Sequence, residues 1–263
     1  MSALRAVTGT ASVLLAPNPG PMTLDGTNSW VLRAPGAQAC VVVDPGPLHE
    51  GHLSALAACG PVAVVLLTHG HADHSEGAAR FAALTGAPVR ALDPAHRLGD
   101  EGLGEGDVVA AAGLEVRVLA TPGHTADSLS FVLDGPGDGA VLTGDTVLGR
   151  GTTVVAHPDG VLGDYLASLR RLRELGPATV LPGHGPELPS AGEAADRYLA
   201  HREQRLAQVQ AAVDGGARTP RAVLEQVYAD VDRALWPAAE LSVRAQLLHL
   251  GVLPAPAGGP GDR

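Results

Sequence analysis

The stretch THGHADH at residues 68–74 directly follows the unbroken apolar run VAVVLL. A short run without polar residues predicts a strand that is buried on both faces, so the polar stretch is expected on the loop at the end of that strand. One residue separates His69 from His71, so a single extended turn can aim both imidazoles at one point. Asp73 and His74 follow at the next turn, where they can serve a second point. Imidazole and carboxylate are ligands that zinc accepts, so this stretch predicts a metal site.

Three later segments repeat one pattern, in which an apolar strand ends in a polar residue next to glycine. LATPGHT presents His124, VLTGDT presents Asp145, and VLPGHG presents His184. Glycine permits tight turns and close backbone approach, and functional sites are usually built on loops at the ends of rigid strands. These three side chains are therefore expected to converge on one edge of a sheet.

Two interpretations without catalysis compete with this one. Unrelated surface histidines would explain a lone His-x-His pair, but they do not explain three further glycine-flanked side chains after apolar strands. A structural metal site is usually a closed four-coordinate cage, commonly rich in cysteine, and Cys40 and Cys59 lack the spacing of a zinc pair. They are expected to be buried free thiols in a reducing compartment. Seven nitrogen and oxygen ligands for two metals leave room for water, which favours a catalytic site.

At these residues the sequence resembles the metallo-β-lactamase superfamily, which includes glyoxalase II, class B β-lactamases and several nucleases. The resemblance covers about residues 12–190 and implies an αββα sandwich with the metals at one edge. An aspartate at the bridging position is similar to the glyoxalase and nuclease branches, whereas the secreted class B lactamases typically have cysteine there, so penicillin hydrolysis is disfavoured. The resemblance implies metal ligands in three groups: His69, His71 and His124 for the first metal, Asp73, His74 and His184 for the second, and Asp145 bridging both.

Two further segments resemble one subgroup of this superfamily. PGPMTLDGTN at residues 19–28 and YLAHRE at residues 198–203 are similar to the lactamase-like-protein-2 subgroup. Its members carry a winged-helix-like C-terminal domain, and some of them cleave single-stranded RNA. Certain fungal thioesterases that release polyketides from carrier proteins are similar too. The subgroup resemblance therefore bears on architecture more than on substrate.

The remaining sequence predicts an α/β catalytic domain followed by a helical one. Apolar periodicity and turn residues predict strands at 11–16, 29–33, 39–43, 62–67, 88–91, 114–119, 128–133, 140–143 and 180–181. Helices are predicted at 49–59, 75–84, 164–175, 191–213, 220–229 and 238–249. We expect a metallo-β-lactamase-fold domain over residues 1–190, a small helical, winged-helix-like domain over 191–253, and a disordered Gly/Pro-rich tail over 254–263.

Charge and hydropathy limit the possible partners. The formal net charge is −10, which argues against broad nucleic-acid binding because such binding needs clustered basic residues. No apolar stretch approaches the ~18 residues of a membrane span. Prolines interrupt the N-terminal region before an apolar signal core could form. A cytoplasmic protein without a membrane segment is expected, and its oligomeric state is open.

The predicted function is hydrolysis assisted by two divalent metal ions. Zinc is the expected ion, although the ligands suit iron and manganese as well. A metal-bound hydroxide would cleave an ester or thioester of a small acyl conjugate, with Asp73 orienting the hydroxide or accepting a proton while it ligates. Two alternatives are a single-strand endoribonuclease and a non-enzymatic metal-binding sensor or scaffold. The expected partner is a small acyl substrate, with single-stranded RNA as the alternative.

Several polar residues outside the ligand set have two possible roles each. Asp44 follows a strand and would either support a ligand or cap the turn. His157 would be a proton donor near the site or a solvated loop residue. Thr27 and Asn28 would either contact the substrate or form a polar turn. His201 and Arg202 would either contact the substrate or join the two domains. Trp236 is expected in the core of the small domain.

Overall fold

Two mixed β-sheets form the centre of the protein. The computed structural model describes residues 3–134 and 139–254. The first sheet has the order β1-β2-β3-β4-β5-β6, with β1 Arg5–Ala6, β2 Ala11–Leu15, β3 Asn28–Leu32, β4 Cys40–Val43, β5 Val62–Leu66 and β6 Val89–Arg90. The second has the order β11-β10-β9-β8-β7, with β7 Val108–Ala111, β8 Leu114–Ala120, β9 Leu129–Leu133, β10 Ala140–Gly144 and β11 Thr179–Pro182. Neighbours pair parallel from β4 to β6 and between β10 and β11, and antiparallel elsewhere.

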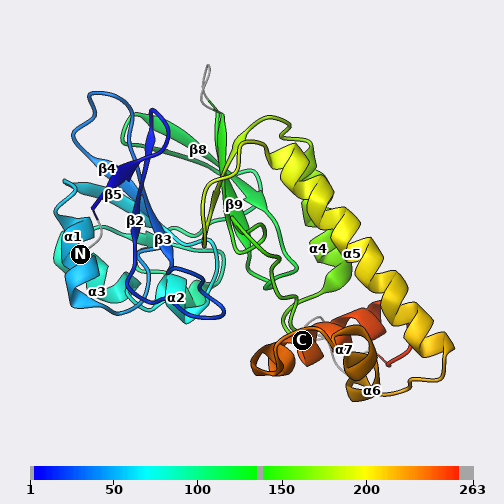
Figure 1. Ribbon diagram of the computed structural model, residues 1–263. Helices are drawn as coiled ribbons and strands as arrows, with labels where there is room; N and C mark the ends of the chain where they lie inside the picture. The colour runs from blue at the N-terminus through cyan, green and yellow to red at the C-terminus, as the bar shows by residue number, and fades with distance from the viewer. Residues whose placement is uncertain (1–2, 135–138, 255–263) are drawn as a thin grey trace.

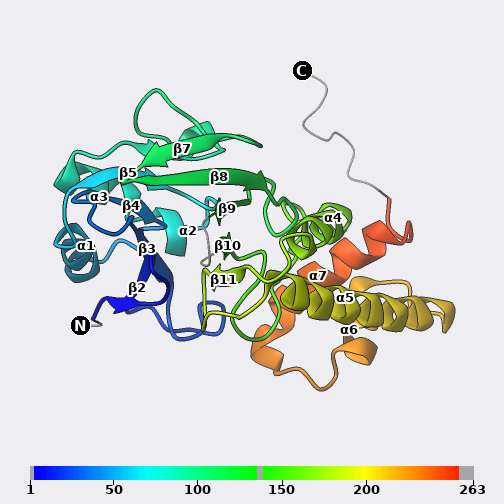
Figure 2. The same cartoon turned by 90° about the horizontal axis from the view of Figure 1, so that it is seen from above.

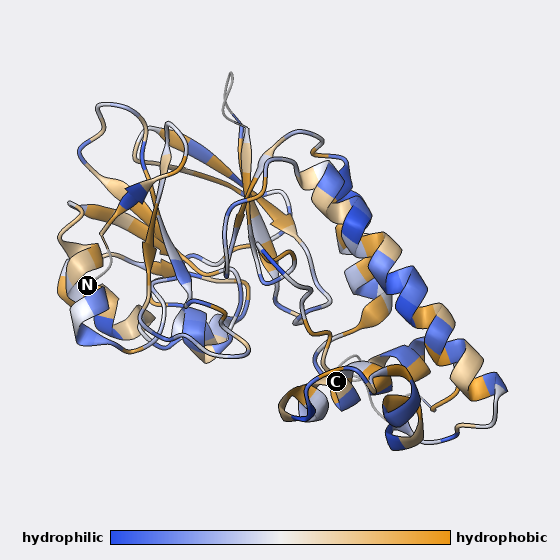
Figure 3. Cartoon of the chain, viewed as in Figure 1, coloured by the Kyte–Doolittle hydropathy of each residue, from blue (hydrophilic) through white to orange (hydrophobic). Residues whose placement is uncertain are grey.

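The two sheets pack face to face around an apolar core. Trp30 and Leu66 of the first sheet belong to the same buried cluster as Val118 and Phe131 of the second. Every residue of β3, β4, β9 and β10 is buried, as expected of strands covered on both faces. Figure 3 shows these strands mostly in hydrophobic colours. Burial of this apolar surface is the main term that holds the sandwich together.

Helices cover both outer faces of the sheets. Leu53 of α1 (Glu50–Ala57) and Phe81 of α3 (Ala78–Thr85) pack on the outside of the first sheet. Leu169 of α4 (Leu162–Arg173) packs on the outside of the second, together with the first half of α5 (Ala191–Asp214). Figures 1 and 2 show the resulting layers from two sides. The predicted αββα sandwich is confirmed.

The C-terminal helices have a core of their own. The far end of α5 contributes Val209 and Val213 to a buried cluster with α6 (Pro220–Val227) and α7 (Trp236–His249). Trp236 lies in this cluster, as the sequence predicts. In Figure 1 these helices lie at the end of α5, beside the sandwich. Because α5 contributes residues to both cores, the packing does not divide the chain at its start, and the domain boundary at residue 190 stays a prediction.

Some predicted elements differ from the observed ones. The helix predicted at 75–84 is divided into α2 (Ala72–Ser75) and α3, so the second half of the THGHADH stretch is helical and not part of a loop. The short strands β1 and β7 were not predicted. Both are short edge strands, of two and four residues, and neither has the alternation of apolar and polar residues that is typical of a strand. Most of the tail predicted to be disordered, residues 255–263, lies outside the described residues. No helix in the described ranges has both the length and the apolar character that crossing a bilayer requires.

His52 in α1 predicts one pH dependence of stability. It is buried, and its Nε2 lies 2.9 Å from Ser29 Oγ. Burial, followed by the charge of His49, lowers the pKa of the imidazole from 6.5 to about 4. The imidazole of His52 is therefore protonated below about pH 6.5 in the unfolded chain, but only below about pH 4 in the folded protein. The contribution of His52 to the free energy of unfolding is complete above this window and is lost as the pH falls through it, by about 2–3 kcal/mol.

This loss can be isolated with the variant His52→Asn. We expect the difference in free energy of unfolding between wild type and variant to shrink by that amount from pH 7.5 to 4.5. Urea unfolding of both metal-free proteins measures it, because loss of metal then plays no part. A difference that does not change with pH would contradict the assignment.

Candidate metal centre

The side chains that the sequence marks as ligands lie together at one edge of the sandwich. His69 follows β5, His124 lies in the loop after β8, Asp145 follows β10 directly and His184 follows β11. His71 is the N-cap residue of α2, and that short helix carries Asp73 and His74. The potential ligand atoms lie within 4.8 Å of one another in three groups: His69, His71 and His124; His69, His74 and Asp145; and Asp73, His74 and His184.

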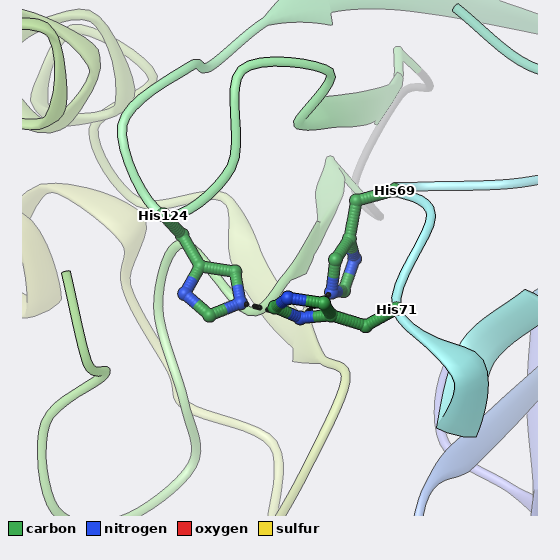
Figure 4. Close-up of side chains that lie close together, drawn as sticks. All are labelled: His69, His71 and His124. Carbon is green, nitrogen blue, oxygen red and sulfur yellow. Dashed lines mark hydrogen bonds between the residues drawn. The ribbon is translucent and has the colours of Figure 1, made fainter. Parts of the chain in front are cut away.

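The first group contains three imidazoles that meet at their nitrogen atoms. Nδ1 of His71 lies 3.1 Å from Nε2 of His69 and 3.1 Å from Nε2 of His124. In Figure 4 the His71 ring lies between the other two, which come from separate loops. Three inward nitrogens are a suitable partial coordination shell for one divalent cation.

The second group combines two imidazoles with a carboxylate. Nε2 of His74 lies 3.2 Å from Nε2 of His184, and Asp73 Oδ2 lies 3.3 Å from the former and 3.1 Å from the latter. Asp145 lies between the two groups. Its Oδ1 is 3.4 Å from the Nε2 atoms of both His74 and His184, and its Oδ2 is 3.7 Å from His124 Nε2. Oδ1 is buried and makes no hydrogen bond among the described residues. Asp145 is therefore placed to contact a cation in each group.

The outer nitrogens of the imidazoles determine which nitrogen faces inward. Three of them contact carbonyl or carboxylate oxygens: His74 Nδ1 at 2.8 Å from Asp44 Oδ2, His124 Nδ1 at 2.7 Å from the Val154 carbonyl, and His184 Nδ1 at 3.1 Å from the Gly26 carbonyl. A carbonyl or carboxylate can only accept, so each Nδ1 carries a proton, and in the neutral form that binds a metal each Nε2 turns a lone pair inward. Lone pairs facing one another at about 3 Å repel unless they share a cation. The donor set therefore fits bound metal ions.

The electrostatics of the site also favour positive charge. Burial disfavours the charged form of His74, but the carboxylates of Asp145 and Asp44 outweigh it and raise its pKa well above 6.5. Burial likewise opposes ionisation of Asp145, but the charge on His74 holds the pKa of that carboxyl well below its usual range. Burial raises the pKa of Asp73, but hydrogen bonds with His184 and His74 outweigh this effect, so the pKa of this carboxyl is lowered too. Both carboxylates are thus ionised at neutral pH and attract cations.

Asp44 supports the second group from behind, which was one of its two predicted roles. The carboxylate is buried and accepts from the Thr68 amide at 2.8 Å and the Thr68 hydroxyl at 2.6 Å, in addition to His74 Nδ1. The Thr68 hydroxyl in turn lies 3.0 Å from His69 Nδ1. One carboxylate therefore orients an imidazole in each group.

Replacing Asp44 with asparagine is expected to weaken metal binding by roughly 10- to 100-fold. The amide nitrogen would place a donor where an acceptor is required. Asparagine keeps the size of the side chain and tolerates the positive φ of 51° at this position. Competition with a fluorescent chelator measures the affinity. The surface variant Asp134→Asn is the control, and equal affinities for the two variants would refute the role.

A cavity of about 320 Å³ opens beside the centre, with His124 and Asp145 in its wall. Much of the remaining wall is apolar and comes from two parts of the chain. The catalytic domain supplies Met22, Leu24, Leu148 and Val154, and the C-terminal helices supply Val231, Leu235, Ala238 and Ala239. The C-terminal domain therefore completes the cavity. Its size is at the lower end of the range for small-molecule sites.

The structure also places the polar residues whose roles were open. Thr27 is buried and its hydroxyl donates to Asp73 Oδ2 at 3.3 Å. The Asn28 amide donates to the carbonyls of Pro182 at 3.0 Å and Gly185 at 2.8 Å, on either side of His184. Both residues therefore support ligand candidates.

The other three open residues divide between two cavities. His201 and Arg202 line the cavity beside the centre. His157 lines a different one, together with His249, and is not part of the site. Sequence reasoning missed the contacts of Val154 and Gly26, because a backbone carbonyl leaves no trace in the residue type.

Comparison with known proteins agrees with this geometry. Residues 22–184 match the family model of the metallo-beta-lactamase superfamily, and residues 219–251 match that of the beta-lactamase associated winged helix domain. A beta-lactamase-like protein 2 homolog of Caenorhabditis elegans is 32% identical over 90% of this chain and 82% of its own length. An atrochrysone carboxyl ACP thioesterase of Aspergillus fumigatus is 34% identical over 80% of this chain and 67% of its own length.

A solved structure shows the same fold along nearly the whole chain. It is a metallo-beta-lactamase family protein from Thermus thermophilus, with a TM-score of 0.77 and 23% identity over 94% of each chain. The family models and the relative from Caenorhabditis elegans together show the family. The chain therefore belongs to the metallo-β-lactamase superfamily of metal-dependent hydrolases and carries the winged helix domain associated with it.

Proposed function

We propose that the protein hydrolyses an ester or thioester of a small acyl conjugate with two divalent metal ions. The observation that carries the proposal is the pair of ligand groups joined by Asp145, beside a cavity with a largely apolar wall. His69, His71 and His124 would hold one ion, Asp73, His74 and His184 the other, and Asp145 both. Zinc suits these ligands best, and iron or manganese are alternatives.

The two ions, when bound, would lower the pKa of a shared water and polarise the substrate carbonyl. The protein supplies the orientation and the proton acceptor. Asp73 is ionised and its side chain is 27% exposed, so its carboxylate can orient the attacking water and take up a proton. The water oxygen forms a bond to the acyl carbon, and the bond to sulfur or oxygen breaks. A thiolate can leave without protonation, which makes a thioester the less demanding substrate.

The cavity supports an acyl substrate over RNA. Its apolar wall suits a hydrocarbon chain, and one relative of this chain is named as a carboxyl ACP thioesterase. RNA binding would need basic side chains free to contact phosphates. Of the three arginines in the cavity wall, two are engaged: Arg150 pairs with Asp25 at 2.9 Å, and Arg205 donates to the Val227 carbonyl at 2.8 Å. The third, Arg202, is buried, and a single buried arginine does not form the basic groove that follows an RNA backbone.

A substrate panel tests the proposal. Protein of known metal content is incubated with acyl thioesters, S-lactoylglutathione, a β-lactam and a labelled single-stranded RNA. We expect thioester cleavage that chelation abolishes and zinc restores, with no cleavage in His69→Ala. RNA cleavage that His69→Ala lacks, without thioester turnover, would overturn the proposal in favour of an endoribonuclease. Restoration by iron or manganese but not zinc would correct the identity of the metal.

A further inference from the structure

Within the described part of the chain, the buried side-chain atoms that lack a hydrogen bond are concentrated at one cavity. Three buried side-chain atoms make no hydrogen bond among the described residues: Asp145 Oδ1, His201 Nδ1 and Arg202 Nε. All three residues line the cavity beside the metal centre. The unpaired oxygen of Asp145 is explained by the proposed metal ions, which it would contact. His201 and Arg202 come from α5, so they form a second polar region in an otherwise largely apolar wall.

Arg202 is a buried charge without a counter-ion. The residue is 4% exposed, and no carboxylate of the described residues lies within 4.0 Å of its guanidinium nitrogens. One nitrogen, Nη2, donates to the Thr153 carbonyl, and the guanidinium carbon lies 5.1 Å from the centre of the Tyr165 ring. These contacts leave Nε–H without an acceptor. A buried guanidinium is costly unless an anion pairs with it.

The other arginines of the cavity wall differ from Arg202 in this respect. Arg150 forms an ion pair with Asp25, and both side chains are at least half exposed. Arg205 is half-buried, stacks at 4.5 Å over the Tyr228 ring and donates to a backbone carbonyl. Arg202 alone among these three arginines combines burial with an unpaired donor.

His201 adds a neutral hydrogen-bonding group beside this charge. Burial, and then the charges of Arg202 and Arg205, lower the pKa of its imidazole. The ring is therefore uncharged at neutral pH and can donate to an oxygen. Arg202 supplies the charge, and His201 supplies a second contact.

The polar region lies close to the metal centre. Thr153 accepts from Arg202 through its carbonyl, and its hydroxyl lies 3.3 Å from His124 Nδ1. A single residue thus separates the guanidinium from a candidate metal ligand. Arg202, His124 and Asp145 line the same cavity, so one bound molecule can contact all three.

We propose that Arg202, assisted by His201, binds an anionic group of the substrate, a carboxylate or a phosphate, while the scissile carbonyl lies at Asp145 and His124. This inference rests on the proposed function and names its substrate class more narrowly. A carboxylate would belong to the acyl part, as in a half-thioester of a dicarboxylic acid. A phosphate would belong to the thiol part. In both cases the anion accepts a hydrogen bond from the Nε–H of Arg202 and balances the charge of the guanidinium.

Matched substrates test this inference and separate the two sources of the anion. The acyl arm compares succinyl, glutaryl and adipyl thioesters of N-acetylcysteamine with the butanoyl, pentanoyl and hexanoyl thioesters. The thiol arm compares butanoyl-coenzyme A with butanoyl-pantetheine. In wild type we expect kcat/KM to be at least tenfold higher for the anionic member in one arm, with the difference mainly in KM. Arg202→Gln should reduce that ratio to below about threefold, and Arg202→Lys should retain part of it. Arg197→Gln, at an exposed position of the same helix outside the cavity wall, is the control and should keep the full ratio.

Binding gives a second readout that does not depend on turnover. Calorimetry on the metal-loaded protein compares glutarate with pentanoate, and coenzyme A with pantetheine. At least tenfold tighter binding of one anionic member, lost in Arg202→Gln, supports the inference. Equal binding and equal kcat/KM within both arms overturn it. In that case, metal-dependent cleavage of the neutral thioesters would leave the proposed function intact.

Discussion

Asp145→Ala is expected to reduce kcat/KM for the best thioester substrate by at least 10³-fold, or about 4 kcal/mol. The reason is geometric. Oδ1 of Asp145 faces His74 and His184, and Oδ2 faces His124, so one carboxylate serves both ligand groups. Without this carboxylate, the two groups lose the anionic side chain that lies between them. Less negative charge then remains beside the imidazoles to stabilise two bound cations. Metal content should fall together with activity.

Turnover and metal content are measured on the same preparation, by initial rates and by elemental analysis. Asp134→Ala is the control, because that carboxylate is 71% exposed and pairs only with Arg117 among the described residues. Two full metal equivalents and a kcat/KM within tenfold of wild type in Asp145→Ala would show that the carboxylate bridges nothing.

Gly183→Ala is expected to abolish binding at the second group while leaving the fold intact. A Cβ atom on Gly183 would lie 2.6 Å from Asp145 Oδ1, 2.7 Å from His74 Cε1 and 3.0 Å from the Gly144 carbonyl carbon. None of these atoms is the end of a freely moving side chain, since His74 is held by Asp44 and Gly144 belongs to β10. The methyl group would displace Asp145 and His74 together, and we expect at least a 10²-fold loss of kcat/KM.

Gly139→Ala is a matched control for this change. It directly precedes β10, at the opposite end of the strand from Gly144, and an added Cβ meets no atom of the described residues within 4 Å. Metal titration followed by calorimetry should show one high-affinity equivalent in Gly183→Ala and two in Gly139→Ala. Two equivalents in both variants would mean that the loop around Gly183 adjusts without cost.

Much of the fold follows from local patterns. The run before Thr68 contains no polar residue and forms β5 at the predicted place, where its last three residues are buried, as expected of a strand that is covered on both faces there. The edge strand β7 escaped prediction because its four residues, VVAA, form a run too short for periodicity to distinguish a strand from other structure. The helical turn at 72–75, which carries Asp73 and His74, was not predicted because its residues are polar apart from Ala72. The helix predicted at 75–84 corresponds to α3, which begins three residues later, at Ala78.

The candidate ligands and the positions of most of them at strand ends could be recognised in the sequence, because side-chain chemistry, glycine turns and apolar periodicity are properties of short segments. Tertiary structure decided the rest. Packing of one sheet on the other places Asp145 between two groups of imidazoles, and backbone carbonyls such as that of Val154 select the nitrogen that faces inward. The docking of α5, α6 and α7 closes the cavity and buries Arg202 without a counter-ion among the described residues. These features depend on segments distant in the chain, so no local pattern could contain them.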